Sequence, residues 1–370
     1  MFKRKILFLM DLPKPIHGMS NVNLAVLRAA EKEIKRLIVI KTAPSYAEKY
    51  FGTKLWGIIK IFHSGFCIIQ LFLMLLRSNS ETIVYRPIYG GLGQLYDIFY
   101  IGLCRVFRAN IFIHHHSFNY LNSYSQLFSM LNKLAGKQAV HIVLGSRMGD
   151  LLSTMYSIQN KNIREISNIA FFNAGIRKKS DTKVLVIGHL ANLCVAKGID
   201  AFAGLCYELK KRGILFKAFI AGPYADVDSE NIVLKLLSEL DEVEYLGSVY
   251  GADKNRFFQS LDAFIFPSKY KNEAEPLVLY EAAQFGVLNI GTQQGCMQEV
   301  IGELHGYSTP DRENIVVELA DTICSAIKRE EFDSVNCIDR VSAFEVLQEQ
   351  AQKSLNNLIC EMREINVSRT

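Results

Sequence analysis

Two glutamates in the C-terminal half of the chain are well placed to do chemistry together. Glu273 and Glu281 are separated by seven residues within the stretch 272–286. Pro276 is expected as the first residue of a helix, since its missing N–H costs nothing there, and Gly286 is expected to end the helix in a left-handed conformation. Glu273 then lies in the loop before this helix, and Glu281 lies about one and a half turns into it.

The helix is expected between two apolar segments, 263–267 and 287–290, which have the composition of buried strands. A strand–loop–helix–strand order is the unit of a parallel sheet. Ligands of such sheets bind at the carboxyl ends of the strands, and a helix N-terminus offers N–H groups to phosphate. Two carboxylates beside that position suit a ligand with both phosphate groups and sugar hydroxyls.

This segment resembles the E-x7-E signature of the retaining glycosyltransferases of family 4, which have the GT-B fold. Other segments resemble the same family: Tyr245–Gly251, Phe266–Ser268, Gly291–Thr292 and Gln298–Ile301. The first of these, which includes Tyr250, is similar to the strand and turn that border the donor base. The resemblance covers roughly residues 180–305 and is weaker before them.

The resemblance implies roles for the residues around the two glutamates. Glu281 would accept hydrogen bonds from the ribose hydroxyls of a nucleotide, strengthened by its charge. Glu273 would stand near the transferred sugar. The backbone N–H groups of Leu277 and Val278 would hold the diphosphate, because they open the helix. An ordinary solvated carboxylate is the alternative for Glu281, and Glu275 has the wrong spacing to replace Glu273.

Lys197, which precedes Gly198 after a predicted strand, is the cation expected at the diphosphate. Many proteins of the resembling family carry an arginine five residues before this lysine, but here that position is Asn192. An asparagine can donate a hydrogen bond to a phosphate oxygen but brings no charge. Lys197 would then carry more of the neutralisation, or another cation would take part. A solvated surface charge is the alternative for Lys197.

Two residues of the N-terminal half are further candidates. Gly18, in the loop 13–20 between a strand and a helix, resembles the glycine that lets the backbone approach the donor phosphate. A plain turn glycine explains it almost as well. His116 corresponds to the family's histidine that contacts the donor sugar, with a packed histidine as the alternative.

Neither metal motif in the chain is convincing. Among the adjacent histidines 114–116, strand alternation puts His115 on the opposite face from the other two, which leaves no third ligand of clear spacing. The sequence Asp226-Val227-Asp228 imitates a D-x-D motif, but it is interpreted as a solvated loop. We therefore expect no metal and no cofactor, the nucleotide-sugar being a substrate.

Composition and charge narrow the class of protein. The 370 residues suffice for two domains, and the eight cysteines form no C-x-x-C pair, so neither a zinc site nor a disulfide scaffold is indicated. Residues 1–170 hold 21 Lys+Arg and 8 Asp+Glu, a net charge of +13, whereas residues 171–370 hold 21 and 29, a net charge of −8. No nucleic-acid-binding motif accompanies the basic half, but an anionic membrane surface attracts the same pattern.

The apolar segment 61–76 could pack in several ways. Its 16 residues include His63, Ser64 and Gln70, and a transmembrane helix needs about 20 apolar residues. A buried helix is therefore expected. The alternatives are a helix that also touches a bilayer surface and a true span.

Alternating strands and helices predict an α/β protein with two parallel sheets. The expected strands are 5–10, 37–41, 83–86, 111–116 and 141–144 in one sheet, and 183–188, 216–222, 243–246, 263–267 and 287–291 in the other. The predicted domains are 1–172 on the acceptor side and 183–340 for the nucleotide-sugar, with polar residues 173–182 as the linker. The amphipathic segment 341–370 is similar to the GT-B helix that crosses back to the first domain. In that fold the two Rossmann-like domains face each other across a cleft.

These features together predict a cytoplasmic, retaining, metal-independent glycosyltransferase of the hexosyltransferase type. Its donor would be a nucleotide-sugar, and its acceptor a glycan or lipid-linked glycan of bacterial surface polysaccharide biosynthesis. It is expected in the cytoplasm or at the inner face of the cell membrane, with no nucleic-acid partner. The alternatives are a GT-B nucleotide-sugar epimerase, a sugar phosphorylase, or a non-catalytic donor-binding subunit.

Overall fold

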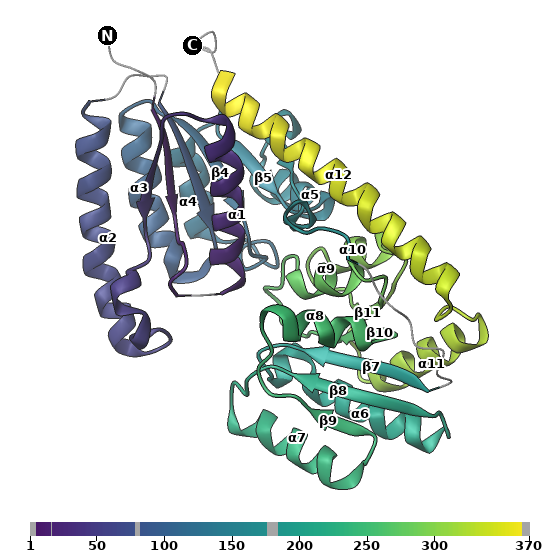
Figure 1. The fold of residues 1–370 in the computed structure, drawn as a ribbon. Helices are drawn as coiled ribbons and strands as arrows, with labels where there is room; N and C mark the ends of the chain where they lie inside the picture. Colours follow the sequence, from purple (N-terminus) through teal and green to yellow (C-terminus); the bar gives the residue numbers. More distant parts are fainter. Residues whose placement is uncertain (1–4, 16, 78–81, 176–183, 365–370) are drawn as a thin grey trace. The chain divides into compact units, whose positions relative to one another are not determined.

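The computed structural model describes residues 5–15, 17–77, 82–175 and 184–364. The chain forms two compact units, which we call the first and second domains: Met1–Phe171 with Ala351–Thr370, and Phe172–Gln350. Each is built around a parallel sheet with helices packed against it (Figure 1). The predicted α/β class is therefore confirmed.

The sheet of the first domain has the strand order β2-β1-β3-β4-β5-β6. Its strands are β1 (Ile6–Met10), β2 (Leu37–Lys41), β3 (Ile83–Ile88), β4 (Asn110–His115), β5 (Val140–Val143) and β6 (Ile163–Glu165). Its helices are α1 (Gly18–Glu33), α2 (Lys54–Leu75), α3 (Gln94–Val106), α4 (Gln126–Ala135) and α5 (Ser146–Tyr156). The central strands are wholly buried, as strands covered on both faces should be. Strand β6 was not predicted, because it is three residues long and carries two charges.

The sheet of the second domain has the order β12-β11-β10-β7-β8-β9. Its strands are β7 (Leu185–Leu190), β8 (Phe216–Ala221), β9 (Val243–Tyr245), β10 (Ala263–Phe266), β11 (Leu288–Thr292) and β12 (Tyr307–Thr309). Its helices are α6 (Ile199–Lys211), α7 (Val227–Glu239), α8 (Gly251–Ser260), α9 (Leu277–Ala283), α10 (Met297–Glu303) and α11 (Ile315–Lys328). Strand β12 was missed because it is short and half polar. The first predicted residue of β7, Lys183, and most of the predicted linker, 176–182, lie outside the described residues.

The last helix, α12 (Ser334–Glu364), begins in the second domain, and from Ala351 on it belongs to the first. Its end is held there by a two-pronged ion pair, in which Arg164 Nε and Nη2 each lie 2.8 Å from a carboxylate oxygen of Glu361. Planar guanidinium–carboxylate pairs of this kind fix orientation as well as contact. The amphipathic pattern at the end of the sequence thus belongs to one continuous helix (yellow in Figure 1).

The prediction of a buried helix at 61–76 is wrong, because much of helix α2 is exposed. Only 22% of its most apolar 18-residue stretch is buried. One face packs against the domain through Ser64, Cys67 and Leu71, but on the opposite face Phe62 is 76% exposed and Phe66 63% exposed. A long, largely apolar helix can bury only the face that meets its own domain, and the sequence does not say whether a second layer covers the rest.

Candidate functional site

The two glutamates of the spaced pair lie where the sequence predicted. Pro276 is one position earlier than predicted: with φ −67° and ψ 124° it is the N-cap of α9, and Leu277 is the first helical residue. The first N–H groups of a helix have no carbonyl partner within it, so Leu277 and Val278 present theirs at the carboxyl side of the sheet. Gly286 has φ +69°, the left-handed conformation predicted from its position.

Glu273 and Lys197 come together from segments 76 residues apart. Lys197 ends a short 3₁₀ turn (Val195–Lys197) after β7, and its Nζ pairs with Glu273 Oε2. The same oxygen accepts a hydrogen bond from Ser268 Oγ at 3.2 Å. Lys197 Nζ also lies over the ring of Tyr270, 4.8 Å from its centroid, a cation–π arrangement. The side chains of Lys197 and Glu273 remain 25% and 12% exposed, so a ligand can reach the pair.

The backbone brings the Lys197 turn close to the end of β10. Lys269 N donates to Ala196 O at 2.9 Å, and the next strand contributes Thr292 Oγ1, which donates to Ser268 O at 2.5 Å. Gly198 makes this approach possible, because with φ +86° a Cβ there would stand 2.2 Å from Pro267 O. The loops that carry Lys197 and Glu273 are thus held together by the main chain.

Glu281 pairs with a residue that the sequence analysis missed. Lys254 Nζ, from α8, lies 2.5 Å from Glu281 Oε1. The other oxygen, Oε2, is buried and has no hydrogen-bond partner among the described residues. A buried carboxylate oxygen without a donor is costly, so this atom is ready to accept hydrogen bonds from a ligand. No sequence signal identified Lys254, since its pairing depends on how α8 packs against α9.

The remaining second-domain candidates lie at the same edge of the sheet but are more exposed. Asn192 is exposed in the loop between β7 and the Lys197 turn. Tyr250 is exposed at the start of α8, four residues before Lys254. Both positions follow strands at their carboxyl ends. Glu275, the rejected alternative to Glu273, is buried and accepts a hydrogen bond from Tyr280 Oη at 2.6 Å.

His116 and Gly18 belong to the first domain. The His116 ring is buried 4.0 Å from that of His114, centroid to centroid, and neither ring nitrogen has a hydrogen-bond partner among the described residues. Burial, together with the neighbouring histidines, holds the pKa of His116 well below its ordinary value, so the imidazole is neutral. Gly18 is the first residue of α1, directly after its N-cap His17.

The strand alternation predicted for the three histidines is confirmed. His115 points away from the other two and bonds His141 Nδ1 through its Nε2 at 3.0 Å, and Tyr120 Oη through its Nδ1 at 2.7 Å. Within the described residues, no group of three or more His, Cys, Asp and Glu side chains is arranged to hold a metal ion.

The Asp226-Val227-Asp228 motif is not a loop, which corrects that part of the prediction. Asp226 is the N-cap of α7, where its side chain accepts a hydrogen bond from Ser229 N at 2.8 Å. The next two residues are helical. An N-cap carboxylate satisfies free N–H groups at a helix start, which gives the aspartate a structural role.

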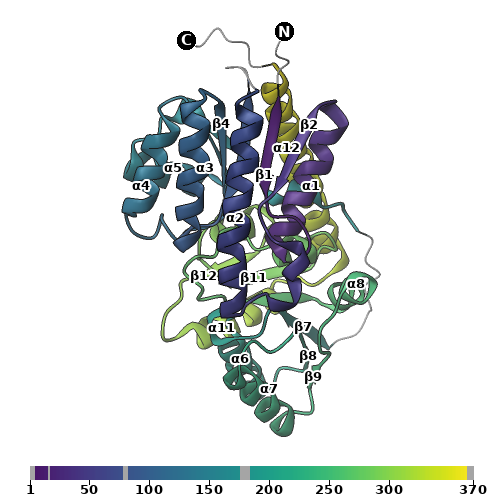
Figure 2. The same ribbon diagram turned by 90° about the vertical axis from the view of Figure 1, so that its left-hand side faces the viewer.

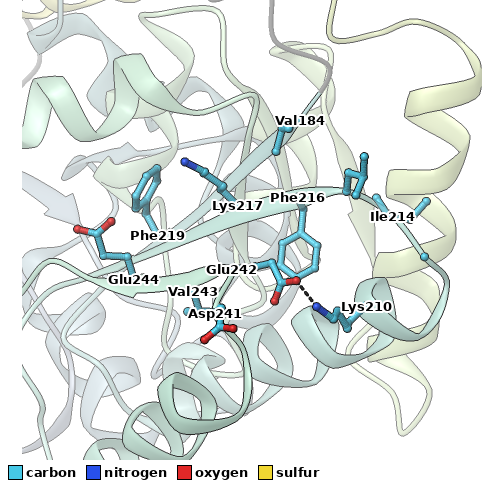
Figure 3. Close-up of a pocket in the computed structure, with 12 residues that line it drawn as sticks. Val184, Lys210, Ile214, Phe216, Lys217, Phe219, Asp241, Glu242, Val243 and Glu244 are labelled. Carbon is cyan, nitrogen blue, oxygen red and sulfur yellow. Dashed lines mark hydrogen bonds and ion pairs between the residues drawn. The ribbon is translucent and has the colours of Figure 1, made fainter.

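A pocket at the opposite edge of the second sheet is a poorer candidate. Figure 3 shows it around residues that precede strands: Val184 before β7, Ile214 before β8, and Asp241 and Glu242 before β9. Glu242 pairs there with Lys210. Because ligands of open parallel sheets bind at the carboxyl ends, the candidate site is the Lys197–Glu273–Glu281 edge.

Comparison with known families points to the same domain. Residues 181–329 match the family model of glycosyl transferases group 1. The match covers the whole candidate edge, from Lys197 to Glu281. No curated protein sequence matches the chain.

Solved structures extend the likeness to both domains. HepE of Anabaena, solved with UDP, is 17% identical over 97% of this chain and 99% of its own, with a TM-score of 0.67. WaaB, a lipopolysaccharide outer core galactosyltransferase, is 14% identical over 96% of this chain and 99% of its own, with a TM-score of 0.66. TarM is 15% identical over 81% of this chain and 58% of its own, with a TM-score of 0.59. The chain therefore has the GT-B fold, as predicted.

Proposed function

We propose that this protein is a retaining glycosyltransferase of the family 4 type, which uses a nucleotide-sugar donor. The observation that carries the proposal is the edge formed by Lys197, Glu273 and Glu281. There a partly exposed cation, a carboxylate beside it and a carboxylate oxygen with no partner in the described part of the chain follow strands of one sheet. The match to glycosyl transferases group 1 supports it.

Each group has a role that follows from its charge and setting. Glu281 Oε2 accepts hydrogen bonds from the ribose hydroxyls, while Lys254 pairs with the other oxygen and keeps the carboxylate in place. Lys197 and the N–H groups of Leu277 and Val278 stabilise the diphosphate as negative charge develops on it, an electrostatic contribution that is often the largest in catalysis. Asn192 and Tyr250 complete the donor site.

Glu273 and His116 act at the sugar in this proposal. When the diphosphate draws Lys197 away, Glu273 loses its partner, and its charge becomes available to a sugar hydroxyl or to positive charge on the reacting carbon. His116, neutral because it is buried, donates or accepts a hydrogen bond without adding charge, and Gly18 lets the backbone approach the donor. The reaction needs neither a metal nor a cofactor in this scheme.

The acceptor is proposed to be a glycan or a lipid-linked glycan of bacterial surface polysaccharide biosynthesis. WaaB, of similar fold, is described as a lipopolysaccharide galactosyltransferase. We propose a cytoplasmic protein that associates with the inner face of the cell membrane. The net charge of +13 in residues 1–170 supports this location.

Donor turnover tests the proposal directly. HepE has been solved with UDP-glucose, so UDP-glucose and UDP are the first ligands to test. We expect UDP to bind, UDP-glucose to be hydrolysed slowly by water in the presence of a chelator, and the glycoside formed with an acceptor to retain the donor's configuration. An inverted product by NMR or a strict need for a divalent ion would overturn the mechanism. UDP binding without turnover of any nucleotide-sugar would indicate a donor-binding subunit.

A further inference from the structure

Helix α2 presents an apolar stripe on the outside of the first domain. Its exposed large side chains recur at spacings of three and four, which places them on one face: Leu55, Ile58, Ile61, Phe62, Phe66, Ile69, Phe72, Leu73 and Leu76. Figure 2 shows α2 along the front of its domain, with no described element of that domain over it. Contiguous apolar surface of this extent marks an interaction site.

Helix α3 adds to this surface. It packs beside α2, with the Phe72 and Phe107 rings 5.8 Å apart and Tyr100 Oη 3.4 Å from Ser64 O. Its own exposed side chains, Leu95, Phe99 and Val106, also recur at helical spacing. We call the exposed apolar residues of the two helices the α2–α3 face.

The inner side of α2 ties it to the domain, so the helix is not free to cross a bilayer. His63 Nε2 lies 2.9 Å from Lys41 O, and Cys67 Sγ lies 3.4 Å from the same oxygen. Lys60 Nζ lies 3.6 Å from Asp11 Oδ2. A helix held by polar contacts on one side and apolar on the other suits the plane of a membrane interface rather than a span.

The charges around the α2–α3 face favour an anionic surface as its binding partner. Residues 49–110 contain seven Lys and Arg against two Asp and Glu. Of the two acidic residues, Asp97 is buried and paired with Arg86. Exposed cations stand near both ends of α2 and at the end of α3: Lys49, Lys54, Arg77, Arg105 and Arg108. Basic side chains around an apolar face fit anionic headgroups over a hydrocarbon layer, whereas a second copy of this chain would bring cations against cations.

We propose that the α2–α3 face docks on an anionic lipid bilayer, with Phe62 and Phe66 entering the headgroup–acyl boundary and the flanking cations contacting the headgroups. This deepens the proposed membrane association by assigning it a surface and an insertion step. It does not depend on Lys197, Glu273 and Glu281, which lie in the other domain. Failure of membrane docking would therefore leave the transfer reaction untouched.

Vesicle sedimentation of the full chain tests the proposal. Vesicles of phosphatidylcholine with phosphatidylglycerol should bind the protein, and vesicles of phosphatidylcholine alone should bind it far less. The double variant F62E/F66E should bind roughly 100-fold more weakly, because burying each phenylalanine contributes about a factor of ten or more. The matched control is V227E/L234E, which adds the same charges at exposed apolar positions of α7; it should bind nearly as the natural chain does.

Salt and a spectroscopic reporter separate insertion from charge attraction alone. Each cation near an anionic surface raises the affinity for vesicles about fivefold, and salt screens this attraction. A fraction of the binding should persist at high salt, because the phenylalanines are inserted. F66W adds a second tryptophan to a chain whose only one, Trp56, is buried. Its emission should shift to the blue and be quenched by brominated lipid.

Three results would overturn the proposal. They are a natural chain that ignores acidic vesicles at low salt, an F62E/F66E variant that binds as well as the control, and an F66W emission that vesicles leave unchanged. If F62E/F66E instead converts a dimer to a monomer in analytical ultracentrifugation while vesicles have no effect, the face is an interface between copies. Circular dichroism of the variants checks that they are folded.

Discussion

The carboxyl edges of the two sheets use their charged residues in opposite ways. In the first domain Arg86 is buried, donates to Leu9 O and Thr42 Oγ1 at 3.0 Å each, and pairs with Asp97 at 2.7 Å. Thr42 Oγ1 in turn donates to Asp11 at 2.5 Å. In the second domain Lys197 and Lys254 each meet one carboxylate and remain partly exposed.

The difference separates structural charges from exchangeable ones. Burial alone would raise the pKa of Asp11, but Lys60, Arg86 and the Thr42 hydroxyl together hold it below its ordinary value. Such a network is satisfied by the protein itself, and a ligand gains little by entering it. The pairs of the second domain can trade a carboxylate for a phosphate, because both members are within reach of solvent.

The largest expected effect comes from breaking the buried network. Arg86→Met should destabilise the first domain by about 3–5 kcal/mol, because it leaves Asp97 buried without a cation and leaves Asp11 with Lys60 alone. Lys197→Met should cost less, about 1 kcal/mol, because its pair with Glu273 is partly exposed to solvent. Urea unfolding of both variants measures the contrast. Equal losses of stability would show that the two edges do not differ as described.

Acid should also destabilise the first domain more than the second. Burial lowers the pKa of His114 and His141 to about 3, and those of His115 and His116 also fall well below the ordinary value. The unfolded chain therefore binds protons that the folded domain excludes, and stability is lost as the pH falls from about 6.5 toward 3, by about 1.4 kcal/mol per pH unit for each histidine.

Among the described residues, the second domain has one comparable group, His189, whose pKa burial lowers to about 4. Hydrogen exchange at pH 7 and pH 5 should show the first domain opening more at the lower pH. Equal loss of protection in the two domains would contradict the assignment.

Much of this architecture could be predicted from the sequence, and for identifiable reasons. Buried parallel strands are apolar throughout, so the central strands were recognised, whereas the short, half-polar β6 and β12 were not. Glu273, Glu281 and Gly286 were placed correctly because their setting is local. Lys254 and the exposure of α2 were missed, since both depend on packing between elements.

Glu273→Gln tests whether Lys197 can exchange its carboxylate partner for a phosphate. We expect turnover of the donor to fall roughly 100-fold, because an interaction with the reacting sugar counts in the transition state. UDP affinity should stay the same or rise, since Lys197 no longer has a charged partner in the protein. Initial-rate kinetics measures the turnover, and titration calorimetry measures the UDP affinity. A variant that loses UDP affinity but keeps its turnover would place Glu273 at the nucleotide instead.

Glu281→Ala should weaken UDP binding by roughly 1.5–3 kcal/mol, the range for hydrogen bonds to a charged group. The natural chain should prefer UDP over its 2′,3′-dideoxy analogue, and the variant should lose that preference. Lys254→Ala is the matched control, because it removes the partner and keeps the carboxylate, so a preference should remain. If Glu281→Ala weakens both ligands equally, the carboxylate does not contact the ribose.

The smallest change in UDP affinity is expected at Asn192, where a substitution can add a cation beside the exchangeable ion pairs of the second domain. Asn192→Arg places a guanidinium at an exposed position near Lys197, so solvent screens it and the gain in UDP affinity should not exceed about 1 kcal/mol. The gain should be larger at low salt and absent for uridine, which has no phosphate. Calorimetry with UDP and uridine at two salt concentrations measures it. An equal effect on both ligands would place Asn192 away from the diphosphate, and loss of UDP binding would show that the edge cannot accept another cation.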